Sequence, residues 1–161
     1  MKIRVCLISI LCILCILFSG CGAEDTISDG AQAVLDAAIN TPNAELHDPD
    51  LFTYPGMSSE DKAAVEEGLA AIQANWEAKL GQYFSPGSFD LFMSSYLRTR
   101  FFADDPVPSK LVSATLVSRD KTLEVVDIQV DLDGTVSSFT VSFHYNEDGL
   151  FYRVEIIEKS E

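Results

Sequence analysis

The stretch that decides the fold is LEVVDIQVDLDGTVSSFTVSFHY, at residues 123–145. Apolar and polar residues alternate on both sides of Asp133-Gly134, and this period of two is typical of strands with one buried face. Asp-Gly is also a strong signal for a two-residue β-hairpin turn, which fixes the register of the strands it joins. The pairs expected across this turn are Val126–Val141 and Ile128–Phe139.

Two further turns extend the hairpin to a four-stranded antiparallel meander. A three-residue turn at 120–122 precedes it, and a four-residue turn at 146–149 follows it. All three turn lengths place apolar side chains on one common face, so they are mutually consistent. The additional pairs expected are Leu116–Val126, Ala114–Ile128, Val141–Val154 and Phe143–Tyr152.

The opposite face of this predicted sheet is mostly polar, and we expect it to contact water or a partner, including a second copy of the chain. Asp127 and Glu155 flank Thr140 there, in the manner of the paired carboxylates of some active sites. Acid–base catalysis needs environments that separate two pKa values, and an open face does not provide them. We therefore treat this row as a candidate interaction face made of Thr115, Asp127, Thr140 and Glu155.

Helical periodicity precedes the predicted strands. Apolar residues recur at steps of three and four in three segments, each opening near a serine that can cap a helix. These segments run from Ser28 to Ile39, from Ser58 or Ser59 to near Phe84, and from Ser88 to Arg100. The chain is thus expected to be α+β, with N-terminal helices packed on a C-terminal four-stranded antiparallel meander.

The first 20 residues have the order of a secretory signal peptide. Lys2 and Arg4 precede a 14-residue apolar run, residues 5–18, that only Ser9 interrupts. Ser19 and Gly20 then supply small residues. A membrane-spanning helix needs about 20 apolar residues, so this run is short for one, although an uncleaved anchor is an alternative.

The end of the apolar run, FSGC at residues 18–21, resembles the lipobox of bacterial lipoproteins. Ser19, Gly20 and Cys21 match that pattern, whereas Phe18 stands where leucine is usual. The resemblance implies cleavage before Cys21 and lipidation of its sulfur, with two acyl chains that anchor stably. The alternative is an incidental thiol near a cleavage site.

This resemblance organises the chain into three parts: a signal peptide at 1–20, a lipidated cysteine and short tether at 21–28, and a single α+β domain at 29–161. It implies an extracytoplasmic location on the outer surface of the cytoplasmic membrane, or on an outer membrane if the host has one. The membrane itself is then a partner through the Cys21 lipid.

Cysteine usage and charge exclude several functions of the folded part. All four cysteines lie in the first 21 residues, which leaves no thiol for a disulfide, a thiolate metal site or a nucleophile after them. The full chain has a net charge of −14, and removing Lys2 and Arg4 leaves 9 basic and 25 acidic residues, a net charge of −16. Such a domain repels nucleic acid, so we expect no nucleic-acid partner.

Few residues suggest chemistry. His47 lies in ELHDPD at 45–50, but neighbouring ligands in a proline-containing loop seldom converge on a metal, and His144 is expected on the outward face. We therefore expect no metal, no cofactor and no catalytic residue. A pocket for a small apolar ligand would be bounded by Trp76, Tyr96, Arg100, Phe143 and Tyr152, although aromatic residues at such spacings more often form a core.

Three helices followed by a curved antiparallel sheet resemble the NTF2-like or cystatin-like α+β cone, and small NTF2-like lipoproteins in particular. The resemblance rests on element order and implies helices that cover the apolar sheet face. Two functions follow from different classes. The first is a non-catalytic binding or interaction module at the cell envelope. The alternative is a small NTF2-like enzyme, an isomerase or hydrolase, which needs a buried carboxylate or tyrosine pair inside the cone.

Overall fold

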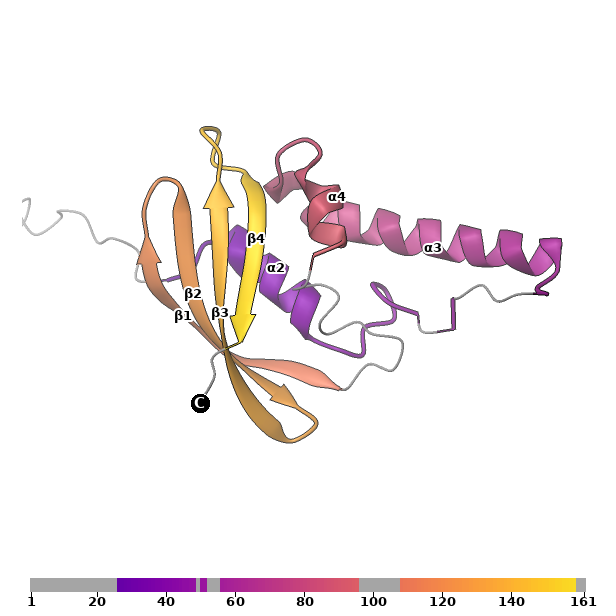
Figure 1. The fold of residues 1–161 in the computed structure, drawn as a ribbon, viewed down its shortest axis with the longest axis horizontal. Helices are drawn as coiled ribbons and strands as arrows, with labels where there is room; N and C mark the ends of the chain where they lie inside the picture. Colours follow the sequence, from indigo (N-terminus) through magenta and orange to yellow (C-terminus); the bar gives the residue numbers. More distant parts are fainter. Residues whose placement is uncertain (1–25, 49, 52–55, 96–107, 159–161) are drawn as a thin grey trace, which may run out of the picture.

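The computed structural model describes residues 26–48, 50–51, 56–95 and 108–158. Its elements run from helices to strands, so the expected α+β class, with helices before an antiparallel sheet, is confirmed. The described helices lie on one side of a twisted sheet (Figure 1). Several predictions fall outside the described residues: those on the segment expected to be a signal peptide, on Cys21, and on the candidate pocket residues Tyr96 and Arg100.

Two of the expected helix starts are confirmed by serine caps. Ser28 Oγ accepts a hydrogen bond from the Ala31 amide at 3.2 Å, and Ser58 Oγ accepts one from the Asp61 amide at 3.1 Å. The third helix is shorter than predicted, because it ends at Met93. The described helical elements are α2 (Asp29–Ile39), α3 (Ser59–Leu80), the short 3-10 helix η1 (Gly81–Tyr83) and α4 (Ser88–Met93).

The sheet is the expected meander, with strand order β1-β2-β3-β4. Asp133 and Gly134 have φ angles of 51° and 87°, the left-handed conformation that a tight Asp-Gly hairpin turn requires. The predicted pairs of Val126 with Val141 and with Leu116 are confirmed. The strands are β1 (Ser109–Arg119), β2 (Leu123–Leu132), β3 (Thr135–Tyr145) and β4 (Phe151–Glu158).

The predicted register between β3 and β4 is wrong by two residues. The turn has five residues rather than four, because the Asn146 amide donates to Leu150 O and the Leu150 amide donates back to Asn146 Oδ1, each at 2.9 Å. A bulge then leaves Tyr152 as one extra residue on β4. These two changes together shift the register by two residues. Because side chains alternate with a period of two, the apolar side of β4 still faces the core. The observed pairs are Val141–Ile156 and Phe143–Val154, in place of Val141–Val154 and Phe143–Tyr152.

This shift changes which side chains meet on the outer face. Glu155 lies opposite Ser142 rather than Thr140, and Thr140 lies opposite Ile157. The bulge also buries Phe151 and leaves Tyr152 46% exposed. The predicted row therefore ends in an exposed apolar residue, not in a second carboxylate.

The core lies between the sheet and α2, and it is completed by Trp76 and Leu80 of α3 and Phe92 of α4. Seven of the eleven residues of α2 are buried, and small side chains let it approach the sheet closely. A Cβ on Gly30 would lie 3.1 Å from the Phe151 ring, so this contact favours glycine. Trp76 anchors the C-terminal part of α3, where its Nε1 donates to Leu46 O at 2.7 Å.

Most of α3 projects beyond this core (Figure 1). Its predicted apolar stripe is only partly buried: Trp76 and Leu80 are covered, whereas Leu69 is 47% exposed. Helical periodicity locates the helix correctly. It does not show that the apolar stripe is longer than the part of the helix that the core covers.

The β3–β4 register can be tested by disulfide trapping. Disulfides require Cα atoms about 4.4–6.8 Å apart, a spacing that directly opposite residues satisfy. The double variant Ser142→Cys/Glu155→Cys should therefore oxidise to a cross-linked monomer, measured by a mass loss of two hydrogens and a peptide map. Thr140→Cys/Glu155→Cys should not, because diagonal residues lie about 7–8 Å apart. Cross-linking in the second variant alone would restore the register expected from turn length.

Candidate functional site

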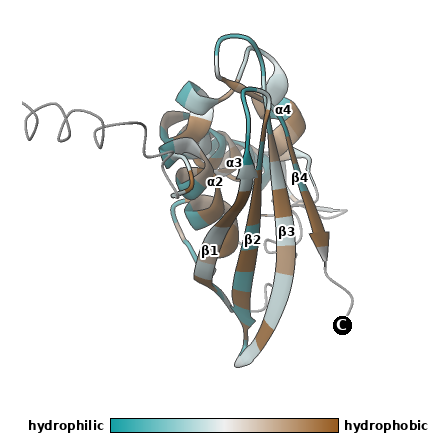
Figure 2. Ribbon diagram, turned by 90° about the vertical axis from the view of Figure 1, so that its left-hand side faces the viewer, coloured by the Kyte–Doolittle hydropathy of each residue, from teal (hydrophilic) through white to brown (hydrophobic). Residues whose placement is uncertain are grey.

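The outer face of the sheet holds the residues singled out as an interaction face. Thr115, Asp127 and Thr140 share one row across β1, β2 and β3, and Thr140 Oγ1 donates to Asp127 Oδ1 at 2.8 Å. Figure 2 shows the sheet in front of the helices, with hydrophilic and hydrophobic positions alternating along its strands. A shallow hollow of about 460 Å³ lies on this face, and its polar lining residues are Ser113, Thr115, Asp127, Gln129 and Ser138.

Glu155 belongs to a separate cluster on the same face. Arg153, two residues earlier on β4, donates a hydrogen bond to Glu155 Oε1. His144 Nε2 lies 3.3 Å from Glu155 Oε2, without the geometry of a hydrogen bond, and the His144 ring lies 5.8 Å from that of Tyr152. Asp127 and Glu155 thus have different partners and do not form a carboxylate pair.

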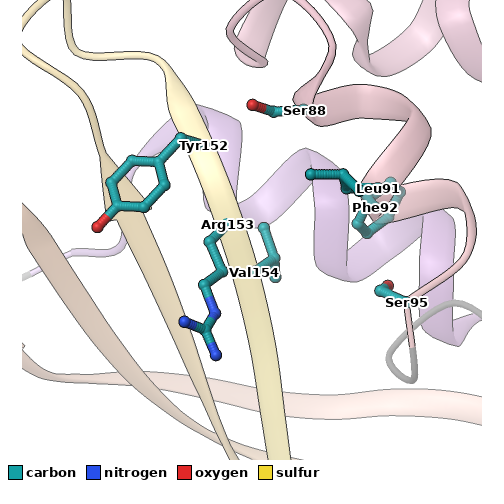
Figure 3. Close-up of a pocket in the computed structure, with 7 residues that line it drawn as sticks. All are labelled: Ser88, Leu91, Phe92, Ser95, Tyr152, Arg153 and Val154. Carbon is teal, nitrogen blue, oxygen red and sulfur yellow. The ribbon is translucent and has the colours of Figure 1, made fainter.

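Of the residues expected around a pocket, the three that the structure describes do not share one cavity. Trp76 and Phe143 are fully buried core residues, and their rings contact Phe92 and Phe151 respectively. Tyr152 lies on the far side of β4 from Leu91 (Figure 3). A pocket of about 360 Å³ does lie between α4 and β4, and it is lined by Ser88, Leu91, Phe92, Ser95, Tyr152, Arg153 and Val154.

A buried carboxylate is the feature that the sequence analysis missed. Glu124 lies opposite Phe143, so its side chain points to the apolar side of the sheet, where it is fully buried. A signal was present, because Glu124 is two residues before the inward-facing Val126 in a strand with a period of two. A buried carboxylate needs partners, and three groups supply them.

The three donors come from distant parts of the chain. The Ser28 amide and Arg119 Nη2 each donate to Glu124 Oε1 at 2.8 Å, and the Tyr145 hydroxyl donates to Glu124 Oε2. Ser28 Oγ lies 2.9 Å from the Tyr145 hydroxyl, which completes a ring of contacts. Arg119 Nη2 also donates to Thr26 O at 2.8 Å. We call Ser28, Arg119, Glu124 and Tyr145 the tether clamp, because they hold the segment that follows the predicted tether.

The electrostatics of the tether clamp fix its protonation. Burial alone would raise the pKa of Glu124, but the hydrogen bonds from Arg119, Tyr145 and Ser28 outweigh it and hold this pKa below its ordinary value. Burial, followed by the hydrogen bond to Glu124, raises the pKa of Tyr145 to about 12. At neutral pH the pair is therefore a carboxylate and a neutral phenol.

This arrangement is better suited to stabilising the fold than to transferring protons to a substrate. A carboxylate has about four lone-pair positions, and three donors already occupy the oxygens of Glu124. None of the pockets described above includes Glu124 or Tyr145 among its lining residues. A general base must lie within reach of the proton it removes, and the Glu124 carboxylate is fully buried with both oxygens already hydrogen-bonded.

In the described ranges, no three His, Cys, Asp or Glu side chains are grouped as a metal site requires. None of the described helices is both long and apolar enough to cross a membrane. No protein-family model, curated protein or solved structure matches the chain.

The pKa of Glu124 predicts a loss of stability in acid. A carboxylate whose pKa is lowered by folding contributes stability above its unfolded value, here 4.5, and this contribution disappears as the pH falls through the folded value. Glu124→Gln should lower the free energy of unfolding at pH 7 by about 1.5–3 kcal/mol, because a neutral amide replaces the charged acceptor of the hydrogen bonds from Arg119 and the two other donors. The variant should also show a flatter dependence of stability on pH below 5, measured by urea unfolding.

Glu155→Gln is the matched control, since Glu155 also accepts from an arginine but its side chain is 41% exposed. This variant should lose less than about 1 kcal/mol. Equal losses in the two variants would mean that the Glu124 carboxylate is not held in a buried network.

Proposed function

We propose that the protein is a membrane-anchored extracytoplasmic lipoprotein whose domain is a non-catalytic binding or interaction module at the cell envelope. The anchoring part of this proposal is supported by the charged, apolar and small-residue order of residues 1–20 and by the match of Ser19, Gly20 and Cys21 to a lipobox. The folded part, with its excess of acidic residues, suits solubility beside such a membrane.

The observation that carries the binding part is the outer face of the sheet. The described helices lie on the other side of the sheet (Figure 2). None of the described elements covers the outer face, so a partner can reach it. Ile157 is 66% exposed and lies opposite Thr140, and Tyr152 is 46% exposed with its ring 5.8 Å from that of His144. Apolar and aromatic residues within a polar surround are typical of protein interfaces.

The enzyme alternative is less well supported. It requires an inward-facing acid or tyrosine that a substrate can reach, and Glu124 with Tyr145 is the pair that meets the first condition. Both groups are occupied by internal hydrogen bonds. At neutral pH Glu124 is a carboxylate and Tyr145 is a neutral phenol. This favours recognition over turnover.

The likeness to an NTF2-like cone is also a proposal. It is supported by the order of helices and strands and by the position of the helices on one face of a twisted antiparallel sheet (Figure 1). A small apolar ligand of such a cone would lie in the pocket between α4 and β4, where Leu91 and Phe92 supply apolar contacts (Figure 3).

The anchor is tested by intact mass. Protein extracted from membranes should begin at Cys21 and carry a diacylglyceryl thioether, and Cys21→Ser should move the protein to the soluble fraction because its acyl chains are lost. Lys110→Ser, which removes a surface charge and leaves Cys21 in place, is the control and should stay with the membrane. A mature protein that retains Met1, or membrane retention of Cys21→Ser, would contradict the proposed anchor.

The same membranes test the binding face. A photo-crosslinking amino acid at Ile157 should give defined products, whereas the same group at Ala70, an exposed position of α3, should not. A product of twice the protein's mass identifies a second copy as the partner. Products from Ala70 alone would move the binding surface away from the sheet.

A further inference from the structure

We infer that the tether clamp determines which end of the domain faces the membrane. The inference rests on the proposed lipidation of Cys21, and the partner it concerns is the bilayer surface itself. The end that faces the bilayer is the one that carries the turn between β1 and β2, at residues 120–122.

The first step is the reach of the chain. Cys21 and Thr26 are separated by five residue steps. Because an extended chain spans at most about 3.3–3.6 Å per residue, Thr26 cannot lie more than about 18 Å from the lipidated cysteine. The segment between Cys21 and Thr26 is therefore short compared with the domain.

The second step is that the tether ends at Thr26 and not farther along the chain. Arg119 holds the Thr26 carbonyl, and Glu124 holds the Ser28 amide, each at 2.8 Å. The acceptor Glu124 is fully buried, so releasing Ser28 would leave a buried charge with fewer partners. Without the tether clamp, residues 26–28 would lengthen the tether and allow the domain to turn over.

The third step is where the tether clamp lies in the sheet. Arg119 is the last residue of β1, Glu124 is the second of β2 and Tyr145 is the last of β3. All three strand ends belong to the same end of the meander. The opposite end carries the Asp133-Gly134 turn, about 30 Å away along the ten residues of β2.

In the resulting orientation the strands run away from the membrane surface rather than parallel to it. Residues 120–122 then lie near the lipid headgroups, and Gln129 and Ser138, which line the hollow on the outer face, lie toward the distal end. In this orientation the hollow stays accessible to a partner that approaches from outside the membrane.

Charge makes the tether necessary for this placement. The two turns at the proximal end carry Asp120, Glu147 and Asp148 against Lys121. Anionic headgroups repel such a surface, so it has no electrostatic attraction of its own to the membrane. The lipid brings this end to the bilayer, and the tether clamp keeps it there.

The test uses single thiols in the full, processed chain. The only cysteine left after processing is Cys21, whose sulfur is blocked by the lipid, so Lys121→Cys and Thr135→Cys each provide one free thiol. Both positions are exposed, and they lie beside the two ends of β2. A fluorophore on each thiol is compared in phosphatidylcholine vesicles that contain headgroup-nitroxide lipid, with detergent-solubilised protein as the unquenched reference.

We expect several-fold stronger quenching at Lys121→Cys than at Thr135→Cys. Adding Glu124→Gln, or Arg119→Met as a second variant, should reduce this difference, and Glu155→Gln should leave it unchanged. Equal quenching at the two positions, or an unchanged difference in both clamp variants, would overturn the inference. Intact mass separates the two failures, because absence of lipid on Cys21 contradicts the proposed function, whereas lipidated protein with equal quenching contradicts only the orientation.

Discussion

The hydrogen bonds that the buried Glu124 carboxylate accepts join the start of the helical layer to one end of the sheet. Burying a charge is unfavourable, and a pair such as Glu124 with Arg119 repays that penalty only if the remaining hydrogen-bonding positions are filled. The Ser28 amide and the Tyr145 hydroxyl fill them. The network therefore joins the ends of β1, β2 and β3 to the residue that precedes α2.

Ser28 links this network to the packing of α2. Its amide donates to Glu124 while its hydroxyl caps the helix at Ala31, so the clamp and the helix start share one residue. Once α2 starts there, Gly30 lies against the Phe151 ring and the apolar side of the helix covers the sheet. The same contact fixes where the predicted tether would leave the domain, which connects the packing of the core to the proposed position on a membrane.

Much of the fold could be predicted from local sequence, because tight turns determine register. The Asp133-Gly134 turn fixed the pairing of β2 with β3, and Ser28 and Ser58 marked two helix starts. The register of β4 could not be predicted from turn length, since it depends on how the Asn146 side chain closes a longer turn and on the bulge at Tyr152. The extent of burial along α3 depends on what packs against it, and periodicity does not report that.

The candidate site was less predictable for a related reason. Parity along β2 was enough to place Glu124 on the apolar face, but its partners lie 96 residues before it and 21 residues after it, and no spacing rule connects them. The outer-face residues Thr115, Asp127 and Thr140 were placed correctly because they depend only on the two confirmed hairpins. Glu155 was misplaced with the rest of β4.

We expect the Ser28 amide to remain hydrogen-bonded to the buried Glu124 carboxylate in solution. Amide hydrogen exchange measures this directly, because exchange requires that the Ser28 hydrogen bond to Glu124 opens. We predict that the backbone amide of Ser28 exchanges as slowly as the backbone amide of Val141 in the core strand β3. Exchange of Ser28 at the rate of an unstructured peptide, while Val141 remains protected, would contradict it.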